Sequence, residues 1–177
     1  MFRAKRMAQE AIEGSHKEQY ALLWRYCEEV KRAMPNSTMV VYIDEGSWHD
    51  PSPRFKRLYC CLAPLKKGFI DACRPIIGLD GGFLKGPYPR QLFSAVGIDA
   101  NNGMFPFAYA VVEKECKSAS VWFLQMVCQD IGISDESTNY TFMSDQQKVK
   151  FLSVSFLLMF LLCLLNQSII PFVFFLP

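Results

Sequence analysis

Two aspartates of this chain lie in or directly after apolar runs that are typical of β-strands. Asp80 lies within residues 76–84, and Asp145 follows residues 140–144. Burying an ionised carboxylate is costly unless it is paired, hydrogen-bonded or bound to a metal ion. Mg²⁺ and Mn²⁺ prefer oxygen ligands, and two such ions can support in-line displacement at phosphorus. The pair predicts a metal-dependent phosphoryl-transfer site, with Asp80 and Asp145 as both catalytic residues and metal ligands.

The neighbours of each aspartate favour a site. Gly81 and Gly82 follow Asp80, and their lack of side chains leaves room for a ligand or another backbone. Asp145 is followed by polar residues, as expected for a site at the end of a strand. Either aspartate alone would more often be a turn or capping residue, so the hypothesis depends on the two lying together.

The elements that would bring them together follow from the hydrophobic pattern. Strands are predicted at residues 76–84, 92–98 and 105–112, followed by a helix at 118–131 and a strand at 141–144. Short turns, including Asn-Asn-Gly at 101–103, imply an antiparallel meander. The nearly continuous apolar run at 76–84 suits a strand covered on both faces. This β-β-β-α-β order begins a ribonuclease-H-like domain, in which the first and fourth strands lie side by side.

Residues 1–72 are predicted to form a separate, largely helical region. Apolar residues at three- and four-residue spacing predict a helix at 17–33 that Pro35 ends. Strands are expected at 38–43 and 55–62, with a loop at 45–54. The expected fold class is therefore α/β (α+β): an incomplete ribonuclease-H-like domain at 73–148, preceded by this helical region and followed by an apolar tail at 149–177.

Charge and cysteine content exclude some classes of site. The net charge of +2 is too small to indicate nucleic-acid binding by itself; residues 1–67 hold 12 Lys/Arg against 8 Asp/Glu, and residues 68–177 hold 7 against 9. The basic surplus at the front is interpreted as a solvated helix face.

Seven cysteines without a CxxC pair, and only two histidines, argue against structural zinc. Free thiols in a reducing intracellular compartment fit this content.

Four segments, taken in order, carry a resemblance to a known family. They are CRPIIGLDGGFLKG at 73–86, AVGIDANN at 95–102, FPFAYAVVEKE at 105–115 and MSDQQK at 143–148. Together they resemble the plant Mutator-like element (MULE, MuDR) transposases, and residues 3–32 are similar to the segment that precedes the catalytic domain there. The chain departs from the family at 118–121, where Glu-Ser-Trp is usual, at Gly82, where Cys is common, and at Pro89-Arg90, where Gly-Gly is usual.

The resemblance implies a DDE transposase, which cuts at the ends of a DNA element and joins them to target DNA with Mg²⁺ or Mn²⁺. Asp80 matches the first catalytic acid and Asp145 the second. Asp99, Glu113 and Glu115 do not match the triad, and a solvated edge is expected for the two glutamates. The implied partners are terminal-repeat DNA and a second copy of the chain, and the implied location is the nucleus.

The residues after Asp145 do not continue this pattern. They contain no Asp or Glu, so the third acid of the family has no counterpart, and we expect a truncated, catalytically incompetent chain. The alternative is a domesticated fragment that binds DNA or protein without chemistry.

The tail at 149–177 carries no charge after Lys150 and has two interpretations. It could be intron read-through, because Val-Lys at 149–150 is encoded by GTN-AAR, which resembles a splice donor. It could instead anchor the chain in a membrane through residues 151–176. The run at 151–165 is shorter than the ~20 apolar residues of a span, so a membrane is not an expected partner.

Overall fold

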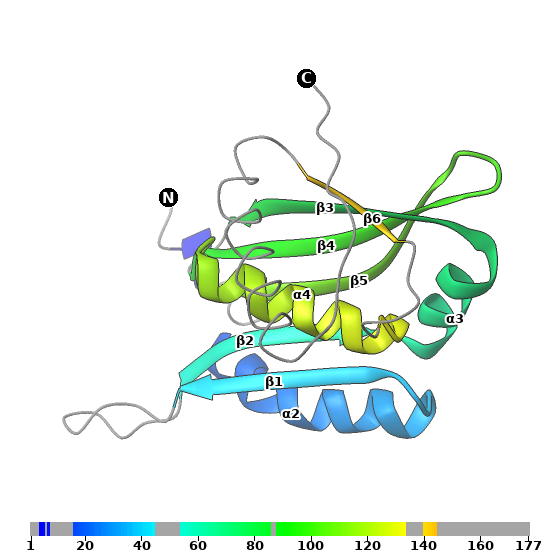
Figure 1. The fold of residues 1–177 in the computed structure, drawn as a ribbon. Coiled ribbons are helices and arrows are strands. Elements are labelled where there is room, and N and C mark those ends of the chain that lie inside the picture. The colour runs from blue at the N-terminus through cyan, green and yellow to red at the C-terminus, as the bar shows by residue number, and fades with distance from the viewer. Residues whose placement is uncertain are drawn as a thin grey trace, which may run out of the picture.

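The computed structural model describes residues 16–44, 54–85, 88–133 and 140–144, together with residues 4, 5 and 7. Within these ranges the chain forms a six-stranded mixed sheet and three helices (Figure 1). The helices are α2 (His16–Ala33), α3 (Ala63–Ala72) and α4 (Lys117–Ile131). The strands are β1 (Thr38–Asp44), β2 (Arg54–Cys61), β3 (Cys73–Leu84), β4 (Arg90–Asp99), β5 (Met104–Val112) and β6 (Thr141–Ser144).

The strand order across the sheet is β1-β2-β5-β4-β3-β6. The expected meander is confirmed, since β3, β4 and β5 pair antiparallel, and β6 runs parallel to β3. The first and fourth strands of the predicted domain therefore lie side by side, and the arrangement is consistent with a ribonuclease-H-like fold. The hairpin of β1 and β2 extends the same sheet through the pairing of β2 with β5, which the sequence analysis did not predict.

Helices cover opposite faces of the sheet, as alternate residues of β2 show. Tyr59 and Cys61 belong to the main core with α4, whereas Cys60 belongs to a smaller cluster with α2. Successive side chains of a strand point to opposite faces, so α4 and α2 lie on opposite faces. In Figure 1, α4 crosses the sheet and α2 runs along β1.

The ends of the elements have local causes. Helix α2 ends at Ala33, two residues before Pro35, as predicted. Helix α4 ends at Gly132, whose φ of 69° is a left-handed conformation that glycine adopts easily. Between β4 and β5, the Asp99 carboxylate accepts hydrogen bonds from the backbone N–H groups of Asn101 (2.9 Å) and Gly103 (2.7 Å). Asp99 therefore has a turn-forming role.

The structure corrects two expectations about these elements. Helix α3 was not predicted from the sequence. The expectation that β3 is covered on both faces is wrong for the residues that the structure describes, because burial on this strand alternates. Ile77 and Leu79 are buried in the core with α4, whereas Asp80, Gly82 and Leu84 are exposed. Most of the expected loop at 45–54 lies outside the described residues, and Arg54 begins β2.

A membrane anchor was one interpretation of the apolar tail. Of the helices that the structure describes, none has the length and apolar character needed to cross a bilayer. The suggested anchor at residues 151–176 lies outside the described residues.

Candidate functional site

The parallel pair of β3 and β6 forms the centre of the candidate site. The register pairs Ile77 with Phe142 and Leu79 with Ser144. Asp80 directly follows Leu79 in the sequence, and Asp145 directly follows Ser144. Asp145 lies outside the described residues, so the observed geometry covers one of the two predicted acids and the immediate neighbour of the other.

Asp80 is exposed, which corrects the expectation of a carboxylate packed in a core. Leu79 before it is 8% exposed, and strand alternation turns Asp80 to the face away from α4. One carboxylate oxygen, Oδ1, accepts a hydrogen bond of 2.7 Å from the backbone N–H of Gly81. Asp80 is not a buried charge, so the argument that burial requires a metal ion or another partner does not apply to it.

The two glycines after Asp80 have different surroundings. A Cβ atom on Gly81 would lie 3.1 Å from the ring of Phe93, so this glycine allows β3 and β4 to pack closely. A Cβ atom on Gly82 would meet no heavy atom of the described residues within 4 Å. The prediction that glycine leaves room here is therefore confirmed at Gly82.

A small cleft opens at the end of β3 and β6, under the start of α4. Its walls include residues of β3, β4, β6, α4 and the turn before α4: Leu79, Asp80, Gly81, Phe93, Glu115, Ser120, Phe123, Leu124 and Ser144. Its space of about 30 Å³ suits a water molecule or an ion and is too small for a nucleotide. The Oγ atom of Ser144 is buried and has no hydrogen-bond partner among the residues that the structure describes.

The two glutamates that follow β5 lie in different environments. Strand β5 ends at Val112, so Glu113 and Glu115 belong to the turn before α4. Glu115 is a wall residue of the cleft that Asp80 also borders. Glu113 instead pairs with Arg57, and it is half-buried. The expectation of one solvated edge for both residues is therefore wrong, and no feature of the sequence next to them distinguishes the two.

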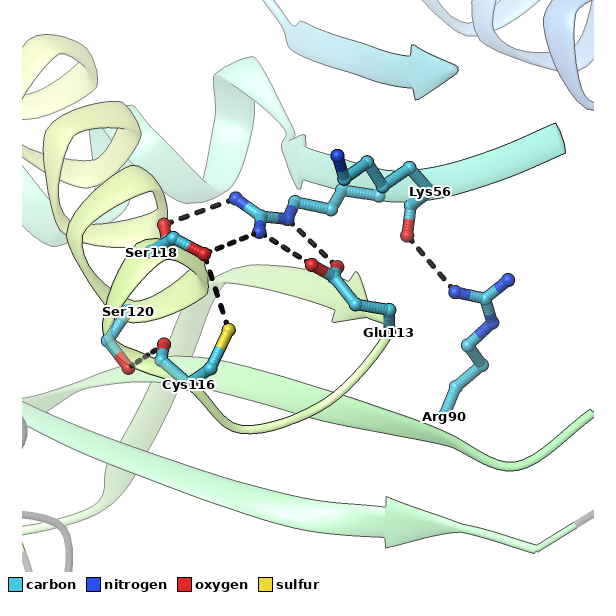
Figure 2. Close-up of polar contacts among 7 residues, drawn as sticks. Lys56, Arg90, Glu113, Cys116, Ser118 and Ser120 are labelled. Carbon is cyan, nitrogen blue, oxygen red and sulfur yellow. Dashed lines mark hydrogen bonds and ion pairs between the residues drawn. The ribbon is translucent and has the colours of Figure 1, made fainter. Parts of the chain in front are cut away.

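Arg57 ties β2 to the turn before α4 through Glu113 and Ser118, which are labelled in Figure 2. Its Nε and Nη2 atoms donate to the two carboxylate oxygens of Glu113 at 2.9 and 2.6 Å. It also donates to the backbone oxygen and the hydroxyl of Ser118, at 3.1 and 3.0 Å, and lies over the ring of Trp122. These hydrogen bonds lower the pKa of Glu113 and raise the pKa of Arg57. The pair therefore holds the first turn of α4, and with it the cleft wall, in position.

A buried network around Asp130 joins α4 to the rest of the fold. The carboxylate accepts hydrogen bonds from Tyr59 Oη (2.8 Å), Lys66 Nζ (2.8 Å) and the hydroxyl of Thr38. The Asp130 side chain is only 7% exposed. All three donors come from different elements, β2, α3 and β1, so this acid has a structural role that the sequence analysis did not identify.

The cysteines of the described residues are free thiols, as expected. Cys27, Cys60 and Cys61 are buried, and burial raises the pKa of each thiol, that of Cys61 to about 12. Thiols with raised pKa values are poor nucleophiles and poor metal ligands. These three buried thiols are therefore unsuited to binding a metal ion.

Of the two acids that could hold a divalent ion, Asp80 lies within the described residues and Asp145 does not. Asp80 supplies an exposed carboxylate of the type that Mg²⁺ and Mn²⁺ prefer, and Gly82 on the same face of β3 carries no side chain. Among residues 16–44, 54–85, 88–133 and 140–144, no group of three or more acidic, histidine or cysteine side chains is arranged to hold a metal ion. A complete site therefore requires Asp145 or another residue outside these ranges.

Comparisons with known proteins bear on the part of the chain that contains this site. No curated protein and no solved structure matched the sequence. The match that was found covers less than half of the chain, begins within β3 and extends beyond β6. Residues 76–154 match the family model of the MULE transposase domain, which confirms the resemblance seen in the sequence for this part of the chain.

Proposed function

We propose that residues 73–148 are the part of a plant-type DDE transposase domain that carries its first two catalytic acids, Asp80 and Asp145. The family match over residues 76–154 supports the lineage. The β-β-β-α-β order and the parallel pairing of β3 with β6 support the fold. Such enzymes act on DNA, so the proposed substrate is the terminal repeat of a transposable element.

The observation that carries this proposal is the pairing of Leu79 with Ser144. One further step in the same parallel register would put Asp80 beside Asp145, with backbones about 5 Å apart and both side chains on one face. Two carboxylates at that separation repel each other unless a cation lies between them. Asp80 and Asp145 would therefore hold Mg²⁺ or Mn²⁺, which would stabilise the attacking and leaving oxygens at phosphorus.

Residues next to Asp80 and at the start of α4 shape the proposed site. The N–H of Gly81 fixes one oxygen of the Asp80 carboxylate. The open space at Gly82 lets a phosphodiester approach Asp80 along β3. The pairing of Arg57 with Glu113 holds the start of α4, which borders the cleft through Ser120, Phe123 and Leu124.

We infer that the 177-residue chain by itself does not cut or join DNA. Residues 146–177 contain no carboxylate, so this sequence offers no third acid after Asp145. A site with two acids would hold and align a pair of metal ions poorly. We propose that such a chain binds DNA without cutting it. The proposed transposase lineage also implies a nuclear location and self-association.

Cleavage of the backbone by bound Fe²⁺ tests the metal site without relying on enzyme activity. Fe²⁺ in place of Mg²⁺, with ascorbate and peroxide, should cut the full chain near residues 80 and 145, as mapped by mass spectrometry. Asp80→Asn should abolish both cuts. Asp71→Asn, which removes an exposed acid of α3 paired with Lys67, should leave them unchanged. Absence of cuts in the unaltered chain, or their survival in Asp80→Asn, would overturn the proposed site.

A nicking assay on Mutator-type terminal-repeat DNA in Mn²⁺ tests the inferred lack of activity. We expect no nicks from the full chain. Nicking by the unaltered chain that is lost in Asp80→Ala would show that the inference is wrong and that another group supplies the third ligand.

A further inference from the structure

An aromatic groove lies on the sheet face that α2 partly covers. It runs between the first turns of α2 and the strand ends at the β3–β4 connection, with about 750 Å³ of space in its larger part. Four aromatic side chains line it: Tyr20, Trp24, Phe55 and Tyr88. We call these four residues, with Arg54, Lys85 and Arg90, the aromatic–basic groove.

The aromatic side chains form an open platform. The Tyr20 ring lies 5.1 Å from the Phe55 ring and 6.2 Å from the Tyr88 ring, measured between centroids. Trp24 and Tyr88 are 57% and 55% exposed. Exposed rings that lie this close together offer surfaces on which flat groups can stack.

The charge of the groove is of one sign. Three cationic residues, Arg54, Lys85 and Arg90, are among its walls, and none of the described wall residues is acidic. The Arg90 guanidinium lies over the Phe55 ring and donates hydrogen bonds to the backbone oxygens of Phe55 (2.9 Å) and Lys56 (3.3 Å). These acceptors are neutral, so they fix the guanidinium without cancelling its charge. The groove therefore suits an anionic ligand that carries flat rings.

The groove continues toward Asp80 along β3. Leu84 is one of its walls, and strand alternation puts Leu84, Gly82 and Asp80 on the same face of β3. Four residues of strand span about 13 Å. Gly82 lies between the two, and within the described part of the chain no heavy atom comes within 4 Å of the position that its Cβ atom would take. No side chain of β3 therefore separates the groove from the candidate acid on this face.

We propose that the aromatic–basic groove binds an unpaired stretch of DNA strand and leads it to Asp80. Bases would stack on Trp24, Tyr88 and Tyr20, and phosphates would lie near the three cations. Paired bases hide their flat faces in the duplex, so these rings select a single strand over a duplex. The direction toward Asp80 rests on the proposed function, whereas binding in the groove requires only the rings and cations described above.

Binding of a fluorescein-labelled oligothymidylate to the full chain, followed by anisotropy in EDTA, tests this proposal. Trp24→Ala and Tyr88→Ala should each weaken binding about tenfold, the usual effect of removing one stacked ring. Tyr26→Ala is the matched control, because Tyr26 lies on the same helix, is also 57% exposed and is not a wall residue of the groove. It should leave the affinity unchanged. Thermal unfolding of each variant would show that the fold is retained.

Salt dependence and competition complete the test. With three cations engaged, the slope of log K against log salt should be roughly −2, and Lys85→Gln should reduce its magnitude by about 0.7. The proposal is overturned if the chain does not bind the oligonucleotide at low salt, if duplex DNA of the same length binds as tightly, or if Trp24→Ala and Tyr88→Ala bind like the unaltered chain. Displacement of the oligonucleotide by a proline-rich peptide that binds more tightly would assign the groove to protein recognition instead.

The two proposals can fail separately. Asp80→Asn should bind the oligonucleotide like the unaltered chain in EDTA, because the groove does not include Asp80. Groove binding without Fe²⁺ cleavage near residue 80 would overturn only the metal site. Cleavage near residue 80 without groove binding would overturn only the groove.

Discussion

Leu79 on β3 and Ser144 on β6 are partners in a parallel ladder, and each is directly followed in the sequence by an aspartate. If the register continues by one residue, cysteines at positions 80 and 145 should form a disulfide on mild oxidation. The expected backbone separation of about 5 Å lies within the range that disulfides span. Peptide mapping by mass spectrometry would detect the cross-link.

The control for this experiment shifts the second cysteine by one position. Asp80→Cys combined with Gln146→Cys should not cross-link, because a shift of one residue turns the side chain to the other face. A cross-link from position 80 to 146, and none to 145, would refute the extended register and with it the proposed pairing of the two acids.

Replacing Glu113 by Gln should lower the free energy of unfolding by about 2 kcal/mol, because it removes charged hydrogen bonds from the nearly buried Arg57. Urea unfolding followed by circular dichroism would measure this. Glu29→Gln is the control, since Glu29 pairs with Arg32 on the exposed face of α2 and should contribute little. Equal effects of the two substitutions would contradict the structural role of the Arg57–Glu113 pair.

The stabilisation from Glu113 should depend on pH in a defined direction. Its pKa is lowered in the folded chain, chiefly by the hydrogen bonds from Arg57, from an ordinary value of 4.5. A carboxyl with a lowered folded pKa stabilises the fold above its unfolded pKa, and this contribution is lost as the pH falls through the folded pKa. The difference in unfolding free energy between the unaltered chain and Glu113→Gln should therefore be full at neutral pH and shrink below about pH 4.5. A difference that grows on acidification would contradict this assignment.

Adding a methyl group at Gly97 should destabilise the fold, whereas adding one at Gly82 should not. A Cβ atom on Gly97 would lie 2.6 Å from the ring of Phe69, which is itself buried and stacked on Phe107. Overpacking of this kind costs about 1–3 kcal/mol. Gly82→Ala meets open space. Melting temperatures of the two variants would distinguish them, and a large loss in Gly82→Ala would show that this surface is occupied.

The parts of the fold that could be predicted are those set by local pattern. Three elements were predictable from local sequence alone. They are α2 from its apolar stripe, β1 from its β-branched residues, and the turn before β5 from Asn-Asn-Gly. Helix α3 was missed because Pro64 and Gly68 weaken its pattern. Pro64 in fact lies in the first turn, where proline is tolerated, and a Cβ atom on Gly68 would lie 2.9 Å from the Phe105 ring. Gly68 therefore allows α3 to pack closely against β5.

The chemistry of individual acids was less predictable than the fold. Asp80 was expected to be buried because its neighbours are apolar. It is exposed because α4 covers only one face of β3, and strand alternation turns Asp80 to the other face. Glu113 and Glu115 look equivalent in sequence, and only the position of Arg57, 56 residues away from Glu113, separates them. Likewise, nothing in the sequence next to Asp130 indicates that its hydrogen-bond donors come from β1, β2 and α3.

The parallel pairing of β6 with β3 has a consequence for how the chain folds during synthesis. Ile76 and Thr141 are partners although 65 residues separate them, whereas β3, β4 and β5 pair with near neighbours in the sequence. The meander can form on the ribosome before residue 141 emerges, because local pairings close small loops and distant pairings close large ones. The edge of β3 that receives β6 is then unpaired for the time that the ribosome takes to make the intervening residues. This edge is the place where a nascent chain would be most open to aggregation or to a chaperone.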